Sequence, residues 1–356
     1  MKIFKKLFLF LAVFYLLTQL SLVFFLPKSA VYNKRLNYEV FKDNVHTIEP
    51  TVKAIKDIIN KQDLKEYIIF VGDSVGYGTP CPPDKTMSSY MNVLAVKENS
   101  GLRVFNLGIP SSMFGDFYAV LLLLDKYGIS TDNLILNFSY WEINAKTPAY
   151  WLKHYLKDLD RESYKAMVSR GHIKEESSWS AAKAELHHGL NSYFAAIGYS
   201  GFISNKIRLN ANVLLNQPKA EIMVWNKKPK LPRTLNLPEN RWYYSDKTFN
   251  LSESSPQIYF LNKIAKHQKE KNTLYFMNAM NDRLLNGATE RPGFQDNLSR
   301  IAQCFIDRGL NYIDYNKKVN YEYFSDHVHL LPEGYEFMAQ DLWKKILMDK
   351  ENSNAV

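Results

Sequence analysis

Two segments far apart in the chain carry the residue types of a nucleophilic serine site. Ser74 ends a Gly-Asp-Ser segment that follows an apolar run, and Asp326 and His329 lie near the C-terminus. A serine hydroxyl becomes a good nucleophile when a histidine takes its proton and a carboxylate orients that histidine. A spacing of three residues lets one turn direct both partners into the same cleft. We therefore expect Ser74 to be the nucleophile, His329 the general base and Asp326 its orienting acid.

Each segment alone is a weak signal, because Gly-Asp-Ser occurs in ordinary turns and Asp-x-x-His among ordinary surface residues. Their joint placement, one after the first core strand and one before the last helix, is more specific. His327 is a second candidate base in the same segment. The Asp-x-x-His spacing favours His329 over His327, which we expect to be a loop residue.

Apolar runs alternate with helical patterns along most of the chain, which predicts an α/β fold with a parallel sheet covered on both faces. Strands are expected at 67–71, 102–107, 134–138, 274–277 and 312–315. Helices are expected at 87–97, 116–127, 258–268, 297–308 and 332–348. In such sheets, ligands bind at the carboxyl ends of the strands. Ser74, Gly108 and Ser139 all follow predicted strands, which supports a site at that edge.

At these residues the chain resembles the SGNH or GDSL hydrolases. The Gly-Asp-Ser after the first strand and the Asp-x-x-His before the last helix match two of their sequence blocks. The resemblance covers roughly residues 64–138 and 256–348. It implies a flavodoxin-like α/β/α sandwich and the acyl chemistry of serine esterases, lipases, deacetylases and acyltransferases. It also implies the roles already given to Ser74, Asp326 and His329.

The resemblance further implies an oxyanion hole made by backbone N–H groups and one side chain. The backbone N–H of Ser74 and that of Gly108, in Asn106-Leu107-Gly108, take the first two places. The third block departs from the family pattern, since Ser139 stands where an asparagine is usual and Asn137 where a glycine is usual. Either side chain is a candidate donor. A block with Ser and Trp is similar to that of the membrane-anchored D-alanyl transfer proteins of teichoic-acid D-alanylation.

The N-terminus carries a long apolar segment. Lys2, Lys5 and Lys6 precede an uncharged run from Leu7 to Leu26, and about 20 apolar residues can span a bilayer. We expect residues 1–30 to be a cytoplasmic tail and an uncleaved signal anchor, with the following domain outside the cell membrane. A cleaved signal peptide and a buried helix are the alternatives.

Charge and cysteine content exclude several classes of protein. The net charge is +9, but residues 1–35 hold six of the 45 basic residues and no acidic one, so the remainder is nearly neutral, with 39 basic against 36 acidic residues. No nucleic-acid partner is expected. The basic run 227–233 is either a solvated loop or a contact for an anionic polymer. Cys81 and Cys304 are expected to be free, with pairing as the alternative, and no spacing predicts a metal site, His187-His188 included.

The domain organisation follows from these signals. Residues 31–63 are predicted to be a linker and a lead-in helix, and 64–350 the catalytic domain, with an insertion at about 141–256 that can form a cap. Helical stretches are expected at 180–188 and 193–209, and the segment 280–283 is expected at the cleft rim. Several aromatic residues of the insertion can stack on sugar rings or pack its own core: Trp141, Tyr150, Trp151, Trp225, Trp242 and Tyr243.

Taken together, the sequence predicts a membrane-anchored serine acyltransferase or esterase without a cofactor. Its substrate would be an acetyl or D-alanyl ester of a surface polysaccharide or polyol polymer, and an integral-membrane protein would be its acyl donor. A plain esterase or lipase for small or lipid esters is one alternative. A non-catalytic polysaccharide-binding or assembly protein that keeps the fold is the other.

Overall fold

The computed structural model describes residues 2–25, 28–174 and 222–354, and the chain divides into two compact units. The first unit comprises residues 1–57 and 175–219, and the second comprises 58–174 and 220–356. Helices predicted at 180–188 and 193–209 lie outside the described residues. The candidate site belongs entirely to the second unit.

The described part of the first unit begins with one continuous helix, α1 (Lys2–Phe25). None of the helices in the described ranges has the length and apolar character that crossing a membrane requires. The predicted linker holds more structure than expected. A short antiparallel pair, β1 (Tyr32–Asn33) and β2 (Arg35–Leu36), precedes α2 (Tyr38–Phe41), and α3 (Ile48–Lys61) follows and continues into the second unit.

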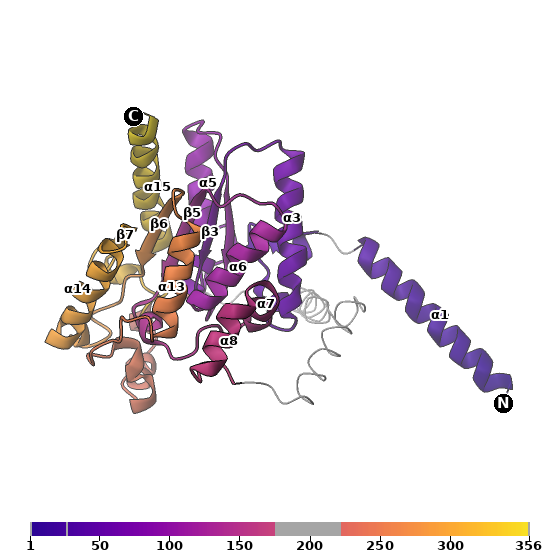
Figure 1. Cartoon of the computed structure of the whole chain (residues 1–356), viewed down its shortest axis with the longest axis horizontal. Coiled ribbons are helices and arrows are strands. Elements are labelled where there is room, and N and C mark those ends of the chain that lie inside the picture. Colours follow the sequence, from indigo (N-terminus) through magenta and orange to yellow (C-terminus); the bar gives the residue numbers. More distant parts are fainter. Residues whose placement is uncertain (1, 26–27, 175–221, 355–356) are drawn as a thin grey trace. The chain divides into compact units, whose positions relative to one another are not determined.

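The second unit is built on five parallel strands in the order β4-β3-β5-β6-β7 (Figure 1). The predicted alternation of strands and helices is confirmed, with boundaries that shift by a few residues. The strands are β3 (Ile68–Gly72), β4 (Val104–Gly108), β5 (Asn133–Phe138), β6 (Asn272–Met277) and β7 (Asn311–Asp314). Each of the first three is almost entirely buried, as expected for strands covered on both faces.

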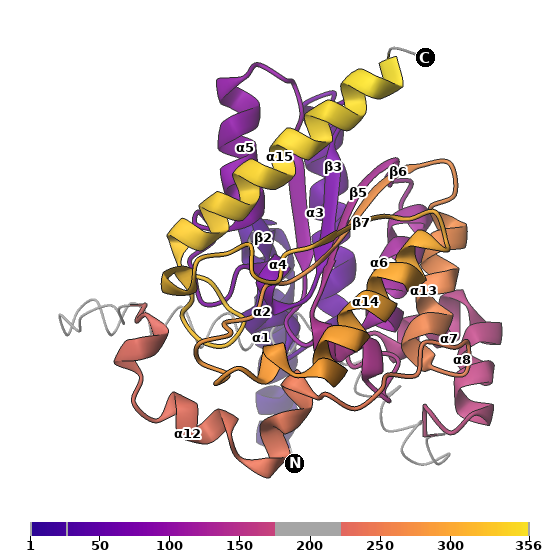
Figure 2. The same ribbon diagram turned by 90° about the vertical axis from the view of Figure 1, so that its left-hand side faces the viewer.

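Helices cover both faces of this sheet (Figure 2). One face is covered by α5 (Met87–Lys97) and α15 (Pro332–Asn354), which also contact each other. The other face is covered by helices that include α6 (Phe114–Lys126), α13 (Pro256–His267) and α14 (Pro292–Ile306). Shorter elements are α4 (Ser74–Tyr77), α7 (Lys153–Leu159), α8 (Arg161–Ser169), α12 (Leu231–Leu235), and the 3-10 turns η3 (Tyr140–Asn144), η4 (Trp225–Lys227), η5 (Pro238–Tyr244), η6 (Ala288–Glu290) and η7 (Tyr321–Tyr323).

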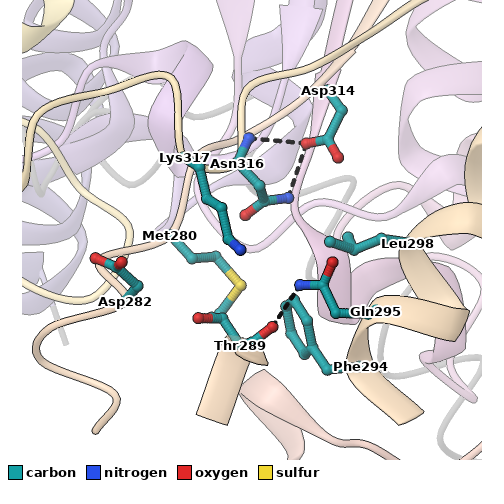
Figure 3. Close-up of a pocket in the computed structure, with 9 residues that line it drawn as sticks. All are labelled: Met280, Asp282, Thr289, Phe294, Gln295, Leu298, Asp314, Asn316 and Lys317. Carbon is teal, nitrogen blue, oxygen red and sulfur yellow. Dashed lines mark hydrogen bonds between the residues drawn. The ribbon is translucent and has the colours of Figure 1, made fainter. Parts of the chain in front are cut away.

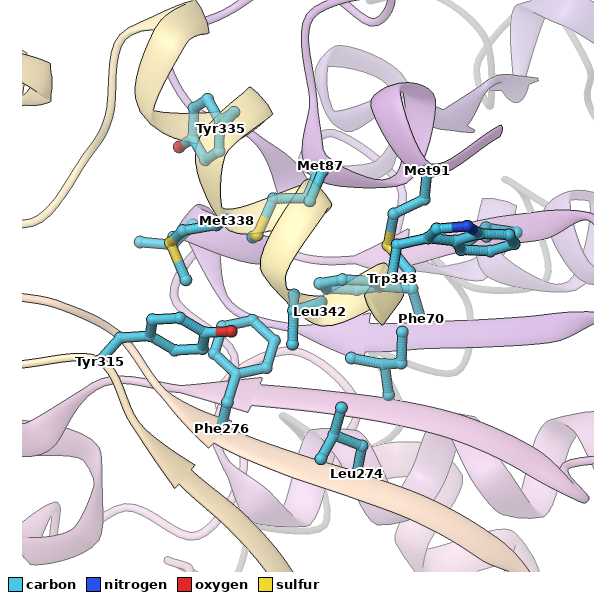
Figure 4. Close-up of a cluster of buried hydrophobic side chains, with 14 of the residues drawn as sticks. Phe70, Met87, Met91, Leu274, Phe276, Tyr315, Tyr335, Met338, Leu342 and Trp343 are labelled. Carbon is cyan, nitrogen blue, oxygen red and sulfur yellow. The ribbon is translucent and has the colours of Figure 1, made fainter. Parts of the chain in front are cut away.

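An apolar cluster packs the last helix against the parallel strands (Figure 4). Side chains of α15 lie between α5 and the strands, and Trp343 is among the largest fully buried residues. Burial of a large apolar side chain contributes about 1.5–3 kcal/mol. The main members are Phe70, Met87, Met91, Leu274, Phe276, Tyr315, Tyr335, Met338, Leu342 and Trp343. This packing brings the C-terminal segment that precedes α15 toward the end of β3.

Candidate active site

Ser74 lies at the point where the strand order of the sheet reverses. β3 is central, with β4 on one side and β5 on the other, and the chain leaves β3 through Asp73 directly into α4. Gly78 ends this short helix with a left-handed backbone, φ 92°, which glycine adopts without a steric penalty. Ligands of open α/β sheets bind outside the carboxyl ends of the strands at such a switch point.

Ser74, His329 and Asp326 form a continuous chain of hydrogen bonds. Ser74 Oγ lies 2.8 Å from His329 Nε2, and His329 Nδ1 lies 2.7 Å from Asp326 Oδ2. The other carboxylate oxygen of Asp326 accepts the backbone N–H groups of Val328 at 3.0 Å and His329 at 2.8 Å. The structure thus brings together the three residues that the sequence predicts, in the order nucleophile, base and acid.

The pKa values of His329 and Asp326 suit a histidine base that is oriented by an ionised acid. Burial opposes the charged imidazolium of His329, but the charge and hydrogen bond of Asp326, helped by Asp73, outweigh it and raise the His329 pKa above 6.5. Burial also penalises the Asp326 carboxylate, yet its interactions with His329 and His327 lower its pKa well below 3.8. Asp326 is therefore ionised throughout the neutral range.

His327 lies beside this chain without the contacts of a general base. Its Nδ1 is 3.6 Å from Asp326 Oδ1, and neither ring nitrogen has a hydrogen-bond partner among the described residues. Burial lowers the pKa of His327 to about 4, so the ring is neutral near pH 7. The serine hydroxyl contacts His329, as the Asp-x-x-His spacing predicts.

The expected oxyanion role of Gly108 needs correction, because its N–H group is already used. It donates to Asn106 Oδ1 at 2.8 Å. The Asn106 amide in turn donates to the carbonyl of Gly76 at 2.8 Å and to Ser88 Oγ at 2.9 Å. Asn106 therefore ties the end of β4 to the turn that carries the nucleophile, and Gly108 is small because a Cβ there would press on the backbone of Gly76 and Tyr77.

Ser139 and Asn137, the two candidate side-chain donors, both serve Asp73 instead. Ser139 Oγ donates to Asp73 Oδ2 at 2.5 Å, and Asn137 Nδ2 donates to Asp73 Oδ1 at 2.6 Å. Both side chains are buried. Because β5 pairs with β3, polar residues at the end of β5 lie close to the carboxylate of Asp73, the residue before Ser74. We correct the sequence prediction accordingly: these donors hold Asp73.

Asp73 is the centre of a buried polar network that sequence reasoning left without a role. Besides Ser139 and Asn137, Asn278 Nδ2 donates to Asp73 Oδ2 at 2.8 Å. The backbone N–H groups of Val75 and Gly76 donate to Asp73 Oδ1 at 2.7 and 3.3 Å. The backbone N–H of Tyr77, later in α4, donates to the Asp73 carbonyl at 2.9 Å, so the amides of Val75, Gly76 and Tyr77 are all paired. A carboxylate with five donors fixes the backbone that presents Ser74.

Glu142 is a second buried acid of this network. Its Oε2 accepts the Ser139 N–H at 3.1 Å, while its Oε1 has no hydrogen-bond partner within the described ranges. Burial, followed by the charge of Asp73, raises the Glu142 pKa well above 4.5. Asp73 and Glu142 therefore form a carboxyl pair in which Glu142 favours its protonated form.

The sequence analysis did not assign Asn278 or Glu142 to the site, although each follows a recognisable sequence pattern. Asn278 comes directly after β6, in the position that Ser139 occupies after β5, and the carboxyl ends of neighbouring parallel strands meet at one edge. Glu142 follows Ser139 by three residues, which is the spacing of a capping box, and the structure shows that box at the start of η3.

Two further segments hold the loop that carries Asp326 and His329. Asn281 donates its backbone N–H to the His327 carbonyl at 2.9 Å, and its side-chain amide reaches the Asp326 carbonyl at 3.4 Å. Lys228 Nζ donates to the Ser325 carbonyl at 2.7 Å. The rim segment 280–283 and the basic run 227–233 therefore both contribute a residue beside the candidate site.

A cavity of about 130 Å³ opens beside the ends of β6 and β7 (Figure 3). Met280 and Asp282 line it on either side of Asn281, so one loop shapes the cavity and supports the acid–base segment. Its other walls are mostly polar, and the Thr289 hydroxyl is buried without a hydrogen-bond partner in the described part of the chain. The remaining lining residues are Phe294, Gln295, Leu298, Asp314, Asn316 and Lys317.

Cys81 and Cys304 are both buried, and neither forms a disulfide with a described residue. The Cys81 thiol donates to the carbonyl of Leu330, the residue after His329, at 3.7 Å. Across residues 2–25, 28–174 and 222–354, His, Cys, Asp and Glu side chains form no group that could hold a metal ion. His187-His188 lies outside the described residues. Burial raises the pKa of the Cys304 thiol, which favours the unreactive protonated form.

Comparison with known proteins does not identify a family for this chain. No protein-family model matches the sequence, and no curated protein is significantly similar to it. What stands on its own is an α/β unit with a five-stranded parallel sheet flanked by helices. At its switch point a serine, a histidine and an aspartate share a hydrogen-bonded chain.

Proposed function

We propose that this protein is a serine acyl-transfer enzyme of the SGNH type. The observation that carries the proposal is the Ser74–His329–Asp326 chain at the carboxyl edge of the sheet. Its distances fall in the range over which a histidine can take a proton from a serine. The raised pKa of His329 and the ionised state of Asp326 fit a base that must hold a proton briefly.

In the proposed reaction, His329 Nε2 accepts the proton as Ser74 Oγ attacks the carbonyl carbon of an ester or thioester. Asp326 stabilises the imidazolium through Nδ1. The Ser74 N–H is the backbone donor that this geometry offers to the oxyanion. Collapse of the tetrahedral intermediate leaves an acyl-serine and a protonated leaving group. A hydroxyl of the acceptor or a water molecule, deprotonated by His329, then releases the acyl group.

The substrate class of this proposal rests on the sequence. An acetyl or D-alanyl ester of a surface or exported polysaccharide fits a domain tethered beside a membrane by residues 1–30. An integral-membrane protein would supply the acyl group. The plain esterase alternative uses the same chemistry with water as acceptor. The tether itself is a proposal from the apolar run Leu7 to Leu26.

One observation favours the non-catalytic alternative. Gly108, Ser139 and Asn137 were the expected oxyanion donors beside Ser74, and all three donate to other groups of the protein. A binding protein that keeps the fold would show the same arrangement. Removal of one oxyanion donor typically costs about 10²–10³ in kcat, so an incomplete hole would weaken catalysis strongly.

Labelling with a fluorophosphonate probe separates these alternatives. The wild-type chain should form a covalent adduct at Ser74, and Ser74→Ala and His329→Ala should not, because triad members act as a unit. Labelling of serines outside the site provides the background. Peptide mapping of the adduct identifies the residue. Absence of labelling in folded wild-type protein would favour the binding-protein alternative.

A further inference from the structure

Four aromatic rings form a continuous cluster that ends beside the candidate active site. Trp141 meets Trp242 edge to face with ring centroids 4.7 Å apart, and Trp242 stacks on Tyr243 at 3.8 Å. Tyr243 then contacts the His327 ring at 4.7 Å. The rings come from η3, η5 and the loop before α15, so distant segments converge on this cluster. We call Trp141, Trp242 and Tyr243 the aromatic platform.

The platform is linked to the catalytic segment by His327. The His327 ring centroid lies 6.4 Å from that of His329, and His327 Nδ1 lies 3.6 Å from Asp326 Oδ1. The charge of Asp326 also contributes to the raised pKa of the Tyr243 hydroxyl, after burial. Tyr243 is therefore within electrostatic reach of the acid that orients the proposed base.

The platform differs from a packed aromatic core in its exposure. Trp242 is 45% exposed although it is stacked on one face by Tyr243. The preceding neighbour of Trp141 shows the contrast, because Tyr140 is 1% exposed and stacks on Phe294 inside the core. A large indole left open to water beside a candidate active site is typical of a ligand-binding surface.

The other aromatic residues that the sequence singled out have different surroundings. Trp225 donates its indole N–H to the Tyr321 carbonyl and packs against the apolar cluster under α15. Trp151 donates its indole N–H to the Pro110 carbonyl and meets Tyr150 edge to face. Of the six aromatic residues that the sequence offers for stacking on sugar rings, the three of the platform therefore remain.

The ring nitrogens of His327, at the inner end of the platform, are buried polar atoms. Both ring nitrogens of His327 are buried without hydrogen bonds among the described residues. Tyr243, whose ring contacts that of His327, is partly buried beside them. A flat apolar surface that ends in unpaired donors and acceptors suits a ligand with a flat apolar face and polar edges.

We propose that the aromatic platform binds a pyranose ring of the substrate, so that the sugar lies next to Ser74. The C–H groups on one face of a pyranose make a flat apolar surface that stacks on an indole. Its hydroxyl groups project from the edge, on the side of the platform where Tyr243 meets His327. A linear polyol lacks such a face. This inference rests on the proposed function and narrows its substrate to a polymer that contains sugar rings.

Binding without turnover tests this inference directly. Full-length Ser74→Ala protein is titrated with cellotetraose and with chitotetraose while heat and tryptophan fluorescence are recorded. We expect saturable binding of at least one of them, and binding weaker by roughly tenfold or more when Trp242→Ala is added. Trp242→Phe, which keeps a smaller ring, should fall between the two and guards against a folding defect.

The controls separate ring stacking from other kinds of binding. Tyr150 is 58% exposed and lies outside the platform, so Tyr150→Ala in the same background should bind as tightly as its parent. A glycerol phosphate oligomer, which has no ring, should not show binding that depends on Trp242. Failure of both tetrasaccharides to bind, or equal binding by the Trp242→Ala protein, would overturn the inference. Fluorophosphonate labelling of wild-type protein would then still decide the proposed function separately.

Discussion

Ser139 Oγ donates a hydrogen bond of 2.5 Å to the carboxylate of Asp73, the residue directly before the candidate nucleophile. The contact joins the end of β5 to the end of β3 and lies under the turn that presents Ser74. The sequence alone assigns Ser139 to the oxyanion hole, whereas here its hydroxyl group donates to Asp73. Since Asn278 also donates to the Ser139 hydroxyl, at 2.9 Å, the ends of three strands share one network.

Ser139→Ala should therefore reduce stability as well as activity. It removes a donor from a buried carboxylate, and hydrogen bonds to charged groups contribute about 1.5–3 kcal/mol. Asn137→Ala should have a similar effect for the same reason. Urea denaturation measures the free energy of unfolding. A variant that kept full stability but lost about 10²–10³ in kcat would instead show that the residue is an oxyanion donor.

The pH dependence of labelling should report the raised pKa of His329. The base works as neutral imidazole, so the labelling rate should rise with pH through a midpoint above 6.5. Asp326 is the main group that raises this pKa, while burial lowers it. Asp326→Asn should therefore move the midpoint to lower pH and reduce the plateau, because the correct tautomer is no longer fixed. A midpoint that does not move would separate Asp326 from the base.

Gly72→Ala should destabilise the chain and disturb the site together. A Cβ on Gly72 would overlap Asn137 Oδ1, whose side chain holds Asp73. Overpacking of this kind typically costs about 1–3 kcal/mol. Gly171→Asn is the matched control, because Gly171 has φ 74° with no atom near its missing Cβ, and asparagine tolerates that backbone. Thermal unfolding of both variants makes the comparison, and equal shifts would contradict close packing at Gly72.

Glu142→Gln should change how stability depends on pH. The folded-state pKa of Glu142 lies well above 4.5, so the folded protein binds this proton more tightly than the unfolded chain. The contribution of Glu142 to the free energy of unfolding is therefore fully present below about pH 4.5 and is lost as the pH rises toward the folded-state pKa. Glutamine keeps a neutral side chain, so the variant should lose less stability over that interval than wild type. Parallel curves would show that Glu142 is ionised in the fold.

Removal of residues 1–27 tests the proposed tether. The full-length chain should sediment with membranes, and the shortened chain should stay folded in the soluble fraction. The cut belongs before Lys28, because Ala30 and Val31 are buried and their carbonyls accept hydrogen bonds of 2.8 Å from the Asn37 side chain and backbone. Recovery of full-length protein from the soluble fraction would argue against the tether.

The sheet could be predicted from sequence because each strand is a short apolar run between helical patterns. The triad could be predicted because Ser74, Asp326 and His329 belong to local segments with fixed spacing. The roles of Gly108, Ser139 and Asn137 could not, since they depend on where a side chain at a strand end points. Asn106 in β4 and Asp73, directly after β3, already accept hydrogen bonds from those donors.

The aromatic residues illustrate the same limit. Trp141, Trp225 and Trp242 are the same residue type. The sequence therefore could not tell which of these side chains is packed in the fold and which is exposed to solvent. Trp225 has a backbone partner for its indole N–H, whereas Trp242 stacks on Tyr243 and remains 45% exposed. The Trp225 indole bonds a carbonyl 96 positions away, and Trp242 meets Trp141 across 101 positions, so a local pattern carries no signal for these contacts.

The separation of Ser74 from His329 by 255 positions has a consequence for the newly made chain. Synthesis from the N-terminus produces Ser74 well before His329. The two meet when α15 packs against α5 and the sheet, which requires that the intervening strands have been made. A growing chain therefore carries Ser74 before His329 is available to it, and the Ser74–His329 contact forms as the last helix docks.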